Sequence, residues 1–176
     1  EALNRSFSET QAIEIIGESG MALSGVDRAA IFEIDTNSTV SCLWFHNISP
    51  EHIEAAVTQF EDLPGGKFIS QIDPVLIEDI NILPEESPGS KLAKQEGFQA
   101  VGLWPLVYED RTVAIFASYH LLPHTWLPAE QEVLLAFSRQ AAVALENTRL
   151  IQKEQQRRQE LARLYRASEA LQSSTK

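Results

Sequence analysis

AVGLWPLVYEDRTVAIFASYH, residues 100–120, is the stretch that decides the fold. Two runs rich in β-branched and aromatic residues, Ala100 to Tyr108 and Thr112 to His120, lie on either side of the polar turn Glu109-Asp110-Arg111. This pattern predicts a β-hairpin. Strands joined by so short a turn pair antiparallel, so the sheet to which they belong cannot be built from βα units alone.

Helices and strands alternate upstream of this hairpin. Ser8 and Gln11 have the spacing of a capping box for a first helix, and Ser49-Pro50 has the composition of a second helix start. The expected elements before residue 100 are a helix through Leu23, strands over 28–35 and 39–47, a helix over 50–60, a strand over 75–80 and a helix over 90–97 capped by Ser90. Because this order holds two hairpins, we predict an α+β fold with a mainly antiparallel sheet and helices packed on it.

A long helix is predicted after the hairpin. From Ala129 to about Gln172 there is no Pro or Gly, and at ~1.5 Å per residue this stretch would reach roughly 65 Å, about twice the width of a compact domain. Its end carries Leu161, Leu164 and Leu171 in the a/d alternation of a coiled coil. We therefore expect a globular domain over residues 1–150, and a coiled-coil linker helix over 151–176 that forms a parallel homodimer and leads to a following domain.

Composition narrows the class of protein. The chain has 176 residues, of which 44% are hydrophobic, enough for one core and a tail. The net charge of −11 argues against nucleic-acid or anionic-membrane partners. Cys42 is the single cysteine, and no apolar run approaches the ~18 residues of a membrane span, so a cytoplasmic location is expected. Because the chain begins at Glu1 and not at Met, we expect a fragment of a longer protein.

The second half of the chain resembles a GAF domain. The resemblance is carried by Trp104-Pro105-Leu106, by the run from Asp110 to Ile115 and by the helical run from Gln140 to Asn147, and the element order matches from about Phe7 to Leu150. It implies a GAF/PAS-like sheet of five or six strands, with the first and last helices on one face and a small-molecule pocket on the other. Ala114 stands where the family often has Gly, a departure that would narrow the pocket or shift the last helix.

The resemblance also implies a setting. Such domains usually occur in multidomain signalling proteins, including the sensor histidine kinases of two-component systems. We expect a non-enzymatic sensory or regulatory module that binds a small molecule and signals through its dimeric C-terminal helix to an effector such as a histidine kinase. The alternatives are a ligand-free dimerisation spacer and an enzyme.

Cysteine content bears on the cofactors that the family uses. Bilin-binding members need a cysteine in or near the helix expected over 90–97, and none is present there, so no covalent bilin is expected. Relatives that reduce methionine sulfoxide use several cysteines, and this chain has one. The Asn-Lys, Phe, Asp-Glu signature of cyclic-nucleotide binding is absent at the family's spacing, although related sites bind without it.

Histidines and aromatic residues supply the remaining candidates. The four histidines have no second ligand at local metal-site spacing, so no metal site is predicted, while His120 alone satisfies the single protein ligand that a haem needs. The aromatic residues of the pocket-forming elements are expected to line the pocket or else to fill the core. The candidate binding residues for an unknown small molecule, such as a nucleotide or an aromatic metabolite, are Trp44, Phe60, Phe68, Asp79, Lys91, Phe98, Trp104, Tyr119 and His120.

Overall fold

The computed structural model describes residues 8–69 and 71–174 of the chain. Its elements are α1 (Glu9–Ser24), β1 (Ala29–Ile34), β2 (Val40–His46), α2 (Pro50–Thr58), β3 (Val75–Ile77), α3 (Pro88–Glu96), β4 (Ala100–Tyr108), β5 (Arg111–His120) and α4 (Pro128–Ser173), with short 3-10 helices η1 (Phe60–Asp62), η2 (Pro64–Ile69) and η3 (Ile80–Ile82). Within these residues the five strands form one sheet in the order β2-β1-β5-β4-β3, and every neighbouring pair is antiparallel.

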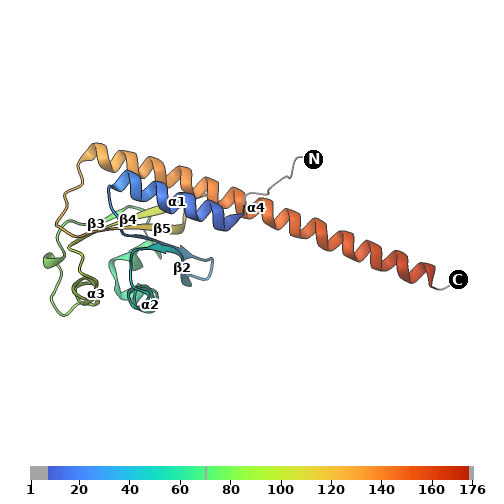
Figure 1. Ribbon diagram of the computed structural model, residues 1–176, viewed down its shortest axis with the longest axis horizontal. Coiled ribbons are helices and arrows are strands. Elements are labelled where there is room, and N and C mark those ends of the chain that lie inside the picture. The colour runs from blue at the N-terminus through green and yellow to red at the C-terminus, as the bar shows by residue number, and fades with distance from the viewer. Residues whose placement is uncertain (1–7, 70, 175–176) are drawn as a thin grey trace.

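Helices cover both faces of the sheet. Figure 1 shows α1 and α4 side by side over one face, and α2 and α3 over the other. The predicted α+β fold with a long C-terminal helix is therefore confirmed. Two buried clusters reflect the layers, one between the sheet and α1/α4 and one between the sheet and α2/α3.

The central hairpin forms where its sequence predicts it. Glu109 and Asp110 both have positive φ, 48° and 60°, a backbone that matches the twist of two strands joined by a two-residue turn. Arg111 is consequently the first residue of β5 and not part of the turn. Pro105 lies beyond Val101–Leu103, the part of β4 that pairs with β3, so on that side its missing N–H interrupts no ladder.

Helix α1 packs unusually close to the sheet. Its capping box is present, because Ser8 Oγ accepts a hydrogen bond from Gln11 N at 3.2 Å and Gln11 Oε1 accepts one from Ser8 N at 2.9 Å. Two glycines on its buried face permit the approach: a Cβ at Gly20 would lie 2.6 Å from the Phe116 ring, and one at Gly17 would lie 2.6 Å from the ring of Trp44. Trp44 therefore belongs to the α1 side of the sheet.

Three boundaries differ by more than one residue from those predicted. Helix α2 ends at Thr58, and Phe60 begins η1 instead. Strand β3 ends at Ile77, because Asp79 caps η3 by accepting a hydrogen bond from Asn81 N. Ser87, not Ser90, caps α3: its hydroxyl accepts a hydrogen bond from Ser90 N, and Pro88 occupies the first helical position.

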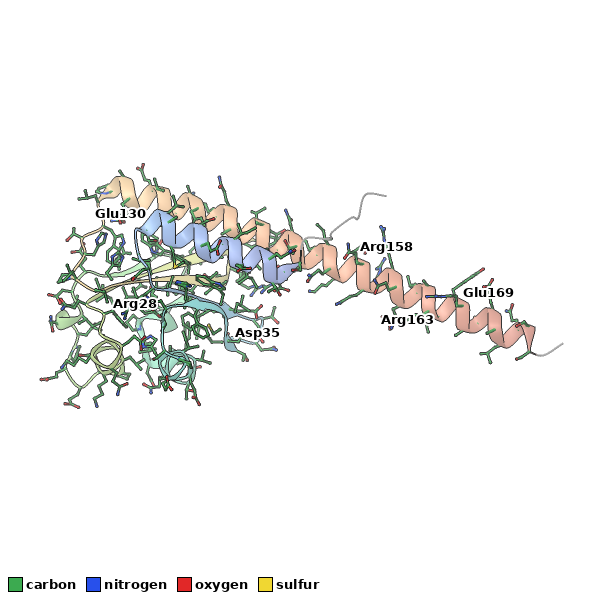
Figure 2. The ribbon with its side chains drawn as sticks, in the orientation of Figure 1. Arg28, Asp35, Glu130, Arg158, Arg163 and Glu169 are labelled. Atoms are coloured by element: carbon green, nitrogen blue, oxygen red, sulfur yellow. The ribbon has the colours of Figure 1, made fainter. Side chains whose placement is uncertain are left out.

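Helix α4 is one continuous helix of 46 residues. Its first half packs on α1 and the sheet, and its buried residues end at Thr148. Every residue from Lys153 to Ser174 is exposed in the described structure, and this half projects away from the sheet (Figure 1). Figure 2 shows Arg158, Arg163 and Glu169 extending from it into open space. Pairing of this half with a second copy stays a prediction.

Candidate functional site

A cavity of about 70 Å³ lies between the sheet and the α2/α3 layer. Its floor includes Phe32 of β1 and Ile115 of β5, which are partners in the strand register. The rest of the wall comes from α2, α3, the three 3-10 helices, β3, β4 and β5. The lining residues are Phe32, His52, Ala56, Phe60, Leu63, Pro64, Gly65, Ile77, Ile80, Leu83, Gly89, Leu92, Phe98, Val101, Leu103, Ile115 and Tyr119.

Strand alternation and helix periodicity place these side chains. Successive residues of a strand point to opposite faces, so Val101 and Leu103 line the cavity while Trp104 is buried in the cluster under α1 and α4. On α2, His52 and Ala56 are four residues apart and therefore share the face that covers the cavity.

The helix ends are tied together beside the cavity. Glu96, at the end of α3, accepts hydrogen bonds from Ser49 N at 2.8 Å and from Ser49 Oγ at 2.6 Å. Ser49 is also the N-cap of α2, since its hydroxyl accepts a hydrogen bond from His52 N. This contact fixes the start of α2 against the end of α3.

His52 and Tyr119 are the two cavity-lining side chains with polar groups. The rings of His52, Phe98 and Tyr119 meet edge to face, with centroids 5.6 Å apart for His52–Phe98, 5.4 Å for His52–Tyr119 and 4.8 Å for Phe98–Tyr119. Burial lowers the pKa of His52, against an opposing effect of Glu96, so its imidazole is neutral at pH 7. Burial likewise raises the pKa of Tyr119, which keeps the phenol protonated.

The structure brings three of the predicted site residues together at the cavity: Phe60, Phe98 and Tyr119. Phe68 is buried in a cluster with Phe60 but lies outside the lining. Trp44 and Trp104 lie outside the lining of this cavity, because both pack on the α1/α4 side of the sheet, in keeping with the core-filling alternative. Their strands alternate between two buried faces, and aromatic content alone does not say which face a residue takes.

The polar candidates also lie outside the cavity lining. Asp79 caps η3, and Lys91 is exposed and pairs with Glu86 at 2.9 Å. His120 stacks on His124 at a centroid distance of 4.2 Å, in contact with Trp126. Burial, followed by the neighbouring His124, lowers the pKa of His120 to about 4. His120 is thus a packed side chain near the start of α4.

Sequence reasoning did not single out His52 as a candidate site residue. The signal available was its spacing, because His52 falls four residues before Ala56 and next to Ile53 on the apolar face of its helix. Ala114, the departure from the family pattern, is fully buried on the α1/α4 side and does not narrow the cavity.

A second polar cluster lies where α4 leaves the body of the domain. Arg149 of α4 donates hydrogen bonds to Glu9 at 2.8 Å, to Glu33 of β1 at 2.6 Å and to Glu146 at 2.9 Å. One guanidinium thus joins α1, β1 and α4. Sequence reasoning did not single out Arg149, because two of its three partners, Glu9 and Glu33, lie far away in the chain.

The described residues contain no group of three or more His, Cys, Asp or Glu side chains arranged to hold a metal ion. None of the helices in residues 8–69 and 71–174 is long and apolar enough to cross a membrane.

Comparison with known proteins identifies the fold. The family profile described as GAF domain matches residues 10–145. A domain of a protein assigned as a two-component sensor histidine kinase from Sinorhizobium meliloti is similar, with a TM-score of 0.71 and 21% identity, over 83% of this chain and 96% of that chain. The photoproduct state of GAF3 from Slr1393 of Synechocystis is similar with a TM-score of 0.68 and 13% identity, over 84% and 99%. A GAF domain/HD domain protein from Geobacter sulfurreducens is similar with a TM-score of 0.66 and 12% identity, over 85% of this chain and 98% of that chain. No curated protein sequence matches significantly.

Proposed function

The chain belongs to the GAF domain family, and from this premise we propose that it is a non-enzymatic sensory or regulatory module of a signalling protein. In this proposal a small molecule binds in the cavity under α2 and α3. The bound state is transmitted through α4, paired with a second copy, to an effector such as a histidine kinase.

The observation that carries the proposal is a direct link through the sheet. Phe32 of β1 lines the cavity, and the next residue, Glu33, reaches the opposite face and accepts a hydrogen bond from Arg149 of α4 at 2.6 Å. A ligand that displaces β1 therefore acts on the base of the projecting helix. Packed interfaces tend to have discrete arrangements, so this contact suits a two-state response.

The lining of the cavity favours binding over catalysis. It consists of apolar side chains with one neutral histidine and one tyrosine, and it includes no carboxylate and no cysteine. Cys42 lies on β2 outside the lining, where burial raises the pKa of its thiol. A covalent bilin is therefore not part of the proposal.

Exposed apolar side chains recur on α4 at the heptad positions of the predicted seam. In the described structure these are Val133, Val143, Leu150, Leu161, Leu164 and Leu171, each about half exposed or more. Several other residues at the same heptad positions are polar: Gln140, Asn147, Glu154 and Arg157. The pattern therefore supports pairing over the domain and at the end of the helix, on either side of the polar stretch over 152–160.

The experiment for dimeric transmission charges this seam. Leu164→Glu combined with Leu171→Glu should turn a dimer into a monomer in light scattering, because two pairs of carboxylates would face each other in the seam. Ala162→Glu with Ala170→Glu adds the same charges at outward positions of the same helix and should leave the dimer intact. A wild-type monomer, or a seam variant that remains dimeric, would place the interface elsewhere.

Ligand binding distinguishes the sensory function from that of a ligand-free dimerisation spacer. A metabolite library should contain compounds that raise the melting temperature of the wild type, since a ligand at about 100 times its dissociation constant adds ~2.7 kcal/mol of stability. Ala56→Leu, which fills the cavity, should abolish these shifts. If no compound shifts the wild type, the spacer function is supported and the sensory function is refuted.

A further inference from the structure

We infer that the cavity selects a small uncharged molecule, about the size of a benzene ring, that is mostly apolar and carries one group able to hydrogen bond to His52. This inference rests on the proposed function and specifies the class of ligand. It departs from the nucleotide considered from the sequence, and three properties of the cavity lead to it.

The first property is charge. None of the seventeen lining residues carries a formal charge at neutral pH, since the imidazole of His52 is neutral and the phenol of Tyr119 is protonated. An anionic phosphate or carboxylate buried here would meet no Lys or Arg in the lining. Removing such a group from water without a partner is costly, so nucleotides and organic acids are disfavoured.

The second property is size. The cavity has a volume of about 70 Å³. Pockets that bind drug-sized ligands have volumes of about 300–1,000 Å³, and a cavity of about 150 Å³ holds benzene. The ligand must therefore be small, and a six-membered ring requires the wall to yield. Part of that wall is made by η1, η2 and η3, 3-10 helices of three to six residues, whose hydrogen-bond geometry is poorer than that of an α-helix. Two glycines also line the cavity, Gly65 of η2 and Gly89 of α3.

The third property is an unpaired polar atom. His52 Nδ1 is buried and has no hydrogen-bond partner among the described residues. The ring nonetheless lines the cavity, held edge to face by Phe98 and Tyr119. Buried polar groups normally have partners, so a hydroxyl or carbonyl on the ligand would satisfy this imidazole and fix the orientation of an otherwise apolar molecule.

The test uses four probes: phenol, benzene, benzoate and cyclic AMP. Binding is measured by titration calorimetry in wild type, His52→Phe, Ala56→Leu and Ala55→Leu. The ¹⁵N resonances of the His52 imidazole are a second readout in the proteins that keep this histidine. Ala55 precedes Ala56 on α2 but lies outside the lining, so it places the same added carbons away from the cavity.

Phenol and benzene should bind the wild type, and benzoate and cyclic AMP should bind at least 10-fold more weakly. Replacing His52 by Phe should weaken the affinity for phenol about 2- to 10-fold, because one hydrogen bond is lost, and leave the affinity for benzene within about 2-fold of the wild type. Ala56→Leu should abolish the binding of both phenol and benzene, and Ala55→Leu should leave the binding of both unchanged. In the wild type, phenol should shift the His52 resonances further than benzene does, a readout that needs no variant.

Three outcomes overturn the inference. The first is benzoate or cyclic AMP binding as tightly as phenol, and the second is phenol binding that is indifferent to His52 in both readouts. The third is that neither phenol nor benzene binds the wild type. Failure of the ligand class is distinguishable from failure of the proposed function. If library compounds stabilise the wild type but not Ala56→Leu, while phenol and benzene do not bind, the class is wrong and the sensory function stands.

Discussion

Replacing Arg149 by Met should destabilise the domain far more than any other single loss of an ion pair on α4. The Arg149 side chain is only 16% exposed, and its guanidinium contacts three carboxylates, those of Glu9, Glu33 and Glu146, at distances of 2.6–2.9 Å. Methionine keeps most of the length of the side chain and removes the charge. The variant therefore leaves three neighbouring carboxylates without their cation.

The expected size follows from this geometry. Each charge-assisted hydrogen bond contributes about 1.5–3 kcal/mol when well shielded, and the three are not additive because one cation serves all. The carboxylates retain 18–31% of their exposure, so solvent screens part of the repulsion. We expect a loss of about 2–4 kcal/mol, equivalent to roughly 5–12 °C in melting temperature for a chain of this length.

Arg158→Met is the matched control. Arg158 lies on the same helix and pairs with Glu154 at 3.0 Å, but its side chain is 77% exposed. Exposed pairs contribute little, so this variant should lose no more than about 0.5 kcal/mol. Both variants are compared with the wild type by urea denaturation at one protein concentration, because dimerisation makes apparent stability depend on concentration. Equal losses in the two variants would refute the view that Arg149 fastens α4 to the domain.

Three further outcomes are expected. The pKa of His120 falls from 6.5 to about 4 on folding, so between these values the unfolded chain binds more protons and stability should fall as pH decreases, by about 1–3 kcal/mol in total; denaturation across pH 4–7 should show a shallower slope for His120→Phe. Gly20→Ala places a Cβ 2.6 Å from the Phe116 ring and should cost about 1–3 kcal/mol despite its better helix propensity, whereas Ser19→Ala on the exposed side should change stability little in the same assay. Removing the α3 cap with Ser87→Ala should cost about 1 kcal/mol in thermal denaturation, and no change would mean that Pro88 alone sets the helix start.

The sequence predicts those parts of the fold that depend on neighbouring residues. The capping box at Ser8, the turn at Glu109-Asp110 and the Ser49-Pro50 start act within a few residues, and each element they define is present. Boundaries fail where two local signals compete. Ser90 and Ser87 both precede apolar positions, and the structure uses Ser87 because Pro88 then takes the first helical position.

The site was less predictable because it depends on which face of the sheet a residue takes. Both faces are covered, so the strands carry apolar residues on both sides and their alternation is weak. Trp104 and Tyr119 were therefore assigned to the same pocket, although they lie on opposite faces. The Arg149 cluster was invisible for another reason: Glu9 and Glu33 are 140 and 116 residues away, and no local pattern marks such a pair.

Because α4 is one uninterrupted helix, the rotation of its far end about the helix axis is fixed relative to the domain. An α-helix turns by about 100° per residue, so removing one residue between the domain and Leu161 would rotate anything attached beyond by that amount, whereas removing seven would shorten the arm by about 10 Å and change its phase by only about 20°. If α4 transmits a rotation, as proposed, the length of the polar stretch over 152–160 can therefore change only in steps of about seven residues. Exchange of such arms between proteins should succeed in steps of seven.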